Sequence, residues 1–242
     1  KVVGAMAALL KDAIKPNLVQ TIEGTPAVLH GGPFASIAQG TNSLIATKMA
    51  LSLGKYVVTE AGFASDLGAE KFFDIKCAEG GLQPKAVVIV ATIRALRHHG
   101  GLKKSELKTP SVEAVYRGLP NLYKHVENIQ QFGLHPLVVI NSFPDDTKEE
   151  IQLVIEHCAG KGIKAVVSTA FTEGGEGSIE LAKEIVELIQ KGGSHFKPLF
   201  DRDMPIEQKI HRIATKIYGA SEVLYSQKAK SDLKLIHELG FD

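Results

Sequence analysis

The chain lacks the features that define disulfide-rich, membrane-spanning and nucleic-acid-binding proteins. Its 242 residues include only two cysteines, Cys77 and Cys158, which do not make a disulfide framework, and their separation excludes a CxxC redox or zinc motif. No apolar run approaches the roughly 18–20 residues that a membrane span needs. A net charge of +1 provides no general attraction to nucleic acid or to an anionic membrane. We therefore expect reduced thiols, a cytoplasmic location and small molecules as partners.

Several widespread catalytic motifs are also missing. The chain contains no GxxxxGK[ST] phosphate-binding loop, no GxGxxG dinucleotide motif and no GxSxG nucleophile motif. A dehydrogenase that uses NAD(P) and a hydrolase with a nucleophilic triad are therefore disfavoured. His98 and His99 have no acidic residue or cysteine at ligand spacing, so a solvated helix end is favoured over a metal site. Asp145 and Asp146 are interpreted as charges at the start of a helix.

What the chain does contain is an alternation of strand-like and helix-like segments. β-Branched or apolar runs predict strands at 27–30, 56–59, 86–91, 137–141 and 165–168. Apolar residues at helical spacing predict helices at 42–53, 113–131, 147–160, 178–191, 205–217 and 226–238. Such alternation is typical of βαβ units, so we predict an α/β fold on a mostly parallel sheet with helices on both faces.

Four of the predicted strands end in loops that contain phenylalanine, and glycine or acidic residues accompany it. In a parallel sheet these loops lie along one edge, where open α/β sheets bind ligands. Each loop carries one aromatic residue: Phe34, Phe63, Phe143 or Phe171. These aromatic rings could enclose a flat heterocycle or belong to the core. The cluster at 174–177, which reads GGEG, could bind an anion with its N–H groups or simply form a tight turn.

Two longer segments are more specific than any short motif. Residues 30–40 read HGGPFASIAQG, and residues 57–77 read VVTEAGFASDLGAEKFFDIKC. Together with the segments at 11–21, 90–96 and 216–220, they resemble formate–tetrahydrofolate ligase over essentially the whole chain. The resemblance implies an enzyme that joins formate to tetrahydrofolate, using ATP with Mg²⁺ and passing through formyl phosphate to give 10-formyltetrahydrofolate, ADP and phosphate.

The resemblance also implies an architecture and an assembly. The nucleotide-binding half of the family is similar to P-loop enzymes, so residues 1–99 are expected to form part of a nucleotide-binding domain. Residues 100–242 are expected to form the folate-binding α/β domain. A monovalent cation, K⁺ or NH₄⁺, is expected as activator, and a homotetramer as the assembly. The alternative interpretation is a folate- or nucleotide-binding module without catalytic activity.

Individual residues receive roles from the same resemblance. Phe63, beside Gly62, falls where the family packs an aromatic residue against adenine, and Phe143 with Pro144 falls in the folate pocket. Phe171 falls where many members carry a tryptophan that stacks on the pterin. Further residues are expected near the phosphates or as ligand contacts: Gln39, Glu60 and Asp66 as catalytic groups, and Gly174 and Gly175 as binding groups. No residue is assigned to a metal.

Three departures from the family pattern shape these expectations. Gln39 replaces a histidine that could carry charge near the phosphates, and Phe171 retains a stacking face without an indole N–H. The family's P-loop has no counterpart in these residues. We therefore expect an internal piece of a longer enzyme that does not turn over in isolation.

Overall fold

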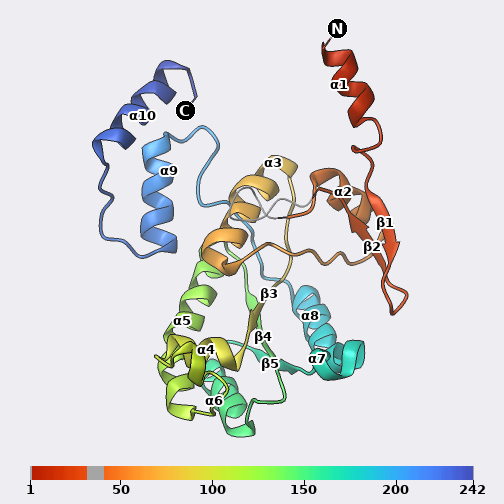
Figure 1. Cartoon of the computed structure of the whole chain (residues 1–242), viewed down its shortest axis with the longest axis vertical. Coiled ribbons are helices and arrows are strands. Elements are labelled where there is room, and N and C mark those ends of the chain that lie inside the picture. Colours follow the sequence, from red (N-terminus) through yellow and green to blue (C-terminus); the bar gives the residue numbers. More distant parts are fainter. Residues whose placement is uncertain (1, 32–40, 242) are drawn as a thin grey trace. The chain divides into compact units, whose positions relative to one another are not determined.

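The structure is a computed structural model, and it describes residues 2–31 and 41–241. It confirms the α/β class expected from the sequence, with helices and strands alternating along the chain (Figure 1). The chain divides into two compact units, which comprise residues 1–82 and 83–242. Within the described residues, no helix is both long enough and apolar enough to cross a membrane.

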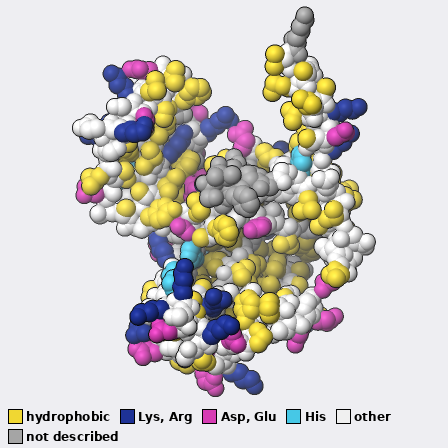
Figure 2. Space-filling model, in the orientation of Figure 1, with side chains coloured by type: hydrophobic (Ala, Val, Ile, Leu, Met, Phe, Trp, Pro, Cys, Tyr) yellow, Lys and Arg dark blue, Asp and Glu magenta, His cyan; other side chains and the backbone are white. Residues whose placement is uncertain are grey.

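The first unit is built from short elements. They are α1 (Val2–Leu10), β1 (Asn17–Gln20), β2 (Pro26–Leu29), α2 (Leu44–Leu53), the π-helical segments η1 (Ala64–Ala69) and η2 (Phe72–Cys77), and α3 (Ala78–Gly80). Strands β1 and β2 form an antiparallel hairpin. No residue of α1 is buried, and its apolar side chains cover the helix at the upper right of Figure 2.

The second unit contains a parallel sheet and most of the helices. Its elements are β3 (Val87–Ala91), α4 (Ile93–His99), η3 (Lys104–Glu106), α5 (Val112–Gln131), β4 (Pro136–Asn141), α6 (Lys148–Ala159), β5 (Ala165–Ser168), α7 (Ala170–Glu173), η4 (Gly174–Ser178), α8 (Ile179–Lys191), α9 (Ile206–Arg212), η5 (Ile213–Ile217) and α10 (Gln227–Glu238). The strand order is β3-β4-β5, and both pairs are parallel.

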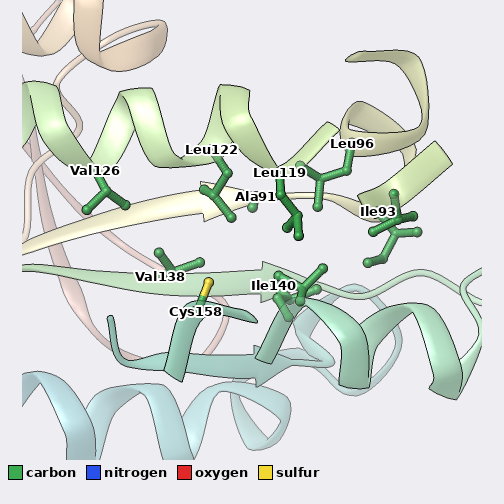
Figure 3. Packing of buried hydrophobic residues seen from close by; sticks show 11 residues of the cluster. Ala91, Ile93, Leu96, Leu119, Leu122, Val126, Val138, Ile140 and Cys158 are labelled. Atoms are coloured by element: carbon green, nitrogen blue, oxygen red, sulfur yellow. The ribbon is translucent and has the colours of Figure 1, made fainter. Parts of the chain in front are cut away.

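Helices cover this sheet on both faces, as the apolar strand sequences require. On one face, residues of α4, α5 and α6 pack against β3 and β4; Leu119 and Leu122 of α5 lie over Ala91 and Val138, and Cys158 comes from α6 (Figure 3). On the other face, the α8 residues Leu181, Ile185 and Leu188 pack against strand residues Leu137, Val139 and Val166. The buried core therefore fixes where the strands end and where their loops begin.

Two expectations about the sheet are wrong. The predicted strand at 56–59 is not a strand, although its valines favour one, because none of the described segments pairs with it. The segment near 27–30 does form a strand, but it pairs with β1 in the antiparallel hairpin and not with the parallel sheet. Of the aromatic loops that the structure describes, those after β4 and β5 follow neighbouring strands of the parallel sheet.

Candidate functional site

The loops that follow β4 and β5 bring two aromatic side chains together. The Ser142 N–H donates to the Ser168 carbonyl at 3.0 Å, which extends the pairing of the two strands by one residue. Just beyond, the ring centroids of Phe143 and Phe171 lie 4.7 Å apart, with their planes inclined by 50°. This distance is within the range of interacting aromatic rings. Two rings held together at a strand edge can offer a planar ligand an apolar contact surface.

Phe171 remains accessible, and its partner is half-buried. Phe171 is 63% exposed, which leaves much of its side chain in solvent. Pro144, the other residue expected in the folate pocket, is also exposed. The exposed Phe171 ring, together with Pro144, has apolar surface to offer a ligand. These three expected residues therefore lie in adjoining loops of one unit, and their role in ligand binding stays a prediction.

The turn that carries Phe171 is held by a second set of interactions. The hydroxyls of Ser168 and Ser178 are 2.9 Å apart, and the Thr169 N–H donates to the Gly177 carbonyl at 3.0 Å. A Cβ atom at Gly177 would lie 2.5 Å from the Thr169 carbonyl carbon, so only glycine fits there. The α7 helix that contains Phe171 is therefore packed closely onto the start of the next helix.

The glycine cluster forms a turn of 3₁₀ helix. Gly174 and Gly175 begin η4, which leads directly into α8. Gly174 adopts a φ of +62°, a region that favours glycine. This geometry agrees with the tight-turn interpretation, and anion binding by the cluster stays a prediction.

The residues expected at the nucleotide edge lie together along one segment of the first unit. Gly62 has a φ of +78°, and Phe63 is 72% exposed immediately before the π-helical segment η1, which contains Asp66. Glu60 is exposed at the start of the same loop. Ala64 has a φ of +54°, which is unusual for a residue with a side chain and is often found at functional sites.

Two expected site residues cannot be placed. Gln39 and Phe34 fall within 32–40, outside the described residues. Before this stretch, His30 makes hydrogen-bonding contacts from Nδ1 to Ser43 Oγ at 2.7 Å and from Nε2 to the Ala13 carbonyl at 2.8 Å. The role given to Gln39 therefore stays a prediction.

A buried lysine in the first unit was not anticipated. Lys76 is 5% exposed, and within the described part of the chain no hydrogen-bond acceptor reaches its Nζ atom. Burial lowers the pKa of Lys76, because a desolvated ammonium group is disfavoured. The Nζ atom lies 5.2 Å from the centroid of the Phe72 ring. A pocket of about 260 Å³ is lined by Lys76 together with His30, Ser43 and Glu79.

A second buried ionic group lies in the larger unit. The side chains of Arg97, at 1% exposure, and Glu150, at 0%, form a bidentate pair with N···O distances of 2.8 and 2.6 Å. Burial raises the pKa of Glu150, but hydrogen bonds from Arg97, Ser111 and Thr147 outweigh it and lower the pKa to about 2. Sequence patterns did not identify this pair: Glu150 looks like an ordinary first-turn acid.

The two cysteines and the adjacent histidines are the remaining candidate groups. Burial raises the pKa of the Cys77 thiol to about 12 and that of Cys158 to about 11, so both stay protonated near neutral pH. Both cysteines are free and both are buried. His98 and His99 are exposed at the end of α4, as expected of a solvated helix end. Among the described residues, no group of three or more metal-ligating side chains is assembled.

Comparison with known protein families gives one match that spans the chain. A family model described as Formate–tetrahydrofolate ligase matches residues 1–242. The match confirms the resemblance found in the sequence segments at 30–40 and 57–77. The enzymes for which the family is named form a carbon–nitrogen bond between formate and tetrahydrofolate. The chain belongs to the formate–tetrahydrofolate ligase family.

Proposed function

We propose that this chain serves the ATP-dependent ligation of formate to tetrahydrofolate, and that the loops after β4 and β5 bind the pterin ring. The observation that carries the proposal is the contact between Phe143 and Phe171, whose ring centroids are 4.7 Å apart. Stacked or tilted aromatic contacts contribute roughly 0.5–1.5 kcal/mol beyond burial. Pro144, exposed beside Phe143, adds apolar surface at the same place.

In the proposed reaction, a formate oxygen attacks the γ-phosphorus of ATP, which gives formyl phosphate and ADP. The folate amine then attacks the formyl carbon, and phosphate leaves as 10-formyltetrahydrofolate forms. Phe63 is assigned to the adenine, with Gly62 allowing close approach. Gln39, Glu60 and Asp66 are assigned to the phosphate end of the site. Gly174 and Gly175 are assigned to a ligand anion.

Positioning and charge stabilisation supply most of the catalysis in phosphoryl transfer. The sequence contains no GxxxxGK[ST] loop to hold the phosphates of ATP. We therefore propose that the 242-residue chain binds folate but does not turn over alone. Residues 1–99 would belong to the nucleotide-binding part and 100–242 to the folate-binding part. Mg²⁺ would accompany ATP, and K⁺ or NH₄⁺ would activate the enzyme. The active enzyme would be a cytoplasmic homotetramer.

The first experiment is a titration of the chain with tetrahydrofolate, in which binding is measured by calorimetry or by fluorescence. Saturable binding is expected in the wild type, and Phe143→Ala should weaken it by roughly tenfold. Phe63→Ala is the control, because Phe63 is an exposed aromatic residue that is assigned to the nucleotide. Absence of binding, or equal weakening by the two variants, would contradict the placement of the folate.

The second experiment tests the activity itself. A longer protein that contains this chain should form 10-formyltetrahydrofolate only when ATP, formate and tetrahydrofolate are all present with Mg²⁺ and K⁺. The absence of product above background would contradict the proposed ligase activity. Binding of tetrahydrofolate without any product would favour the alternative, a folate-binding module.

A further inference from the structure

The loop between β4 and α6 is closed by the Asp146 side chain. Asp146 Oδ2 accepts a hydrogen bond from the main-chain N–H of Phe143 at 2.9 Å, and the Asp146 N–H donates to the Phe143 carbonyl at 3.0 Å. The Asp146 side chain is only 2% exposed. A short acidic side chain that bonds to the backbone three residues earlier fixes the path of a turn. Asp146 therefore restrains the main chain from which the Phe143 ring projects.

The Arg97 side chain also contacts this loop. The Arg97 Nη2 group donates to the Asp145 carbonyl at 3.2 Å and lies 3.9 Å from Asp146 Oδ1. Its Nη1 group donates to the Leu107 carbonyl at 2.8 Å, so one guanidinium joins two loops to the helix that carries Glu150. A planar guanidinium can bond in several directions at once, which an ammonium cannot do with the same geometry.

Glu150 in turn fixes the orientation of Arg97. Besides the bidentate pair, Glu150 Oε1 accepts from the Ser111 N–H at 2.8 Å, and Oε2 accepts from the Thr147 N–H at 3.1 Å and hydroxyl at 3.0 Å. All of these donors are at helix N-termini, Ser111 for α5 and Thr147 for α6. The carboxylate is therefore saturated with hydrogen bonds and is not free to shift.

We propose that Asp146, supported by the buried Arg97–Glu150 pair, is a positioning residue that holds the Phe143 ring against Phe171. Through this contact it sets the affinity for the pterin ring, a consequence that rests on the proposed function. The chain of contacts runs from the core, through Glu150 and Arg97, to the Asp145 carbonyl and the Phe143 N–H. These contacts restrain the main chain at Phe143 and so influence where its ring lies.

The test measures the ring contact directly, without any ligand. Nuclear Overhauser effects between the Phe143 and Phe171 ring protons are recorded in the chain with labelled phenylalanine. The wild type should show the effect, and Asp146→Ala should lose most of it while the contacts within the β3-β4-β5 core remain. Asp146→Asn should retain it, because an amide oxygen can still accept the Phe143 N–H. The matched control is Asp145→Ala, which keeps the carbonyl that Arg97 contacts.

A folded Asp146→Ala protein with the wild-type ring effect would overturn the proposal. So would loss of the effect in both Asp146→Asn and Asp145→Ala, because general charge loss would then explain it. If Asp146→Ala does not fold, Arg97→Lys is measured instead, since the three donors of a lysine ammonium cannot make the four hydrogen bonds that Arg97 makes to Glu150 and to the Leu107 and Asp145 carbonyls. Arg97→Lys should weaken the ring effect, and an unchanged effect would overturn the proposal.

Binding of tetrahydrofolate is the second readout, and it separates this proposal from the proposed function. Asp146→Ala should raise the dissociation constant about tenfold, the factor expected when an aromatic contact is lost, and Asp146→Asn should stay near the wild type. If the ring effect changes as expected but binding does not, the positioning is correct and the folate assignment fails. If neither changes, the positioning itself fails.

Discussion

Glu150 is a fully buried carboxylate whose charge is held by five hydrogen bonds. Its pKa of about 2 lies below the ordinary value for glutamate of roughly 4.3. Between these values the unfolded chain binds more protons than the folded one. Stability contributed by Glu150 is therefore present above about pH 4.3 and is lost as the pH falls toward 2.

We therefore predict an acid-sensitive fold whose sensitivity depends on Glu150. The free energy of unfolding, measured by urea titration from pH 6 downward, should fall by on the order of 3 kcal/mol through this window, because one pKa unit corresponds to about 1.4 kcal/mol. Glu150→Gln should be less stable at neutral pH but should lose most of this dependence. The exposed neighbour gives the control, and Glu149→Gln should behave as the wild type does. Equal acid dependence in all three proteins would contradict the role of Glu150.

Lys76 presents the opposite situation, a buried ammonium group whose charged form is disfavoured by desolvation. Because no described acceptor reaches its Nζ atom, replacing it by an apolar chain of similar length removes a desolvation cost. Lys76→Met should raise the free energy of unfolding by about 1–3 kcal/mol. Lys48→Met, at an exposed position of α2, should change it by less than about 0.5 kcal/mol.

The pH dependence gives a further check on Lys76. Its lowered pKa means that the unfolded chain binds the proton more tightly, so the wild-type stability should increase as the pH rises toward about 10.4, the ordinary lysine value. Lys76→Met should lack this increase. A destabilised Lys76→Met protein would show instead that the ammonium group makes a favourable interaction.

Phe63 tests the nucleotide edge at the scale of one side chain. Because its ring is 72% exposed, Phe63→Ala should change stability by less than about 0.5 kcal/mol. In a longer, active protein that contains this chain, the same variant should raise the Michaelis constant for ATP more than that for tetrahydrofolate. The reverse order would remove Phe63 from the adenine site.

At the scale of elements, the helix-to-strand packing around α7 controls where Phe171 lies. Gly177→Ala would place a Cβ atom 2.5 Å from the Thr169 carbonyl carbon and 2.7 Å from the Ala170 nitrogen. The turn must move, which should cost about 1–3 kcal/mol of stability and weaken tetrahydrofolate binding. Gly160→Ala is the control, since its nearest atoms beyond the chain neighbours lie at an ordinary 3.5 Å and its φ is −59°. Wild-type binding by Gly177→Ala would show that the turn does not position the ring.

The elements also show what the sequence could and could not predict. The strands β3, β4 and β5 were predicted because continuous apolar runs such as 87–91 suit a strand covered on both faces. The strand at 56–59 was predicted wrongly, because a β-branched pair indicates local preference but not a pairing partner. The π-helical segments η1 and η2, which follow Phe63, were not predicted from the sequence.

The candidate site was predictable to a similar extent. Phe143 and Phe171 were placed near each other because both follow parallel strands of one sheet, and the rings do lie in contact. The Arg97–Glu150 pair was missed because the positions look like the exposed charges of ordinary helix ends. Only the packing of α4, α5 and α6 shows that these two charges are buried and pair across 53 residues of sequence.

At the scale of the whole molecule, the described structure separates into two units that carry different parts of the proposed chemistry. The parallel sheet and the aromatic pair belong to residues 83–242, and Phe63 with the surrounding glycines belongs to residues 1–82. The central claim is that Phe143 and Phe171 act together on one pterin ring. Two groups that touch each other and the same ligand should have coupled effects on its binding.

A double-mutant cycle on tetrahydrofolate binding tests this claim most directly. The dissociation constant is measured for the wild type, Phe143→Ala, Phe171→Ala and the double variant under the same conditions. Each single change should raise it by roughly tenfold, and the double change by clearly less than the roughly hundredfold product. An unaffected single variant, or effects that multiply fully, would contradict a shared aromatic site for the pterin.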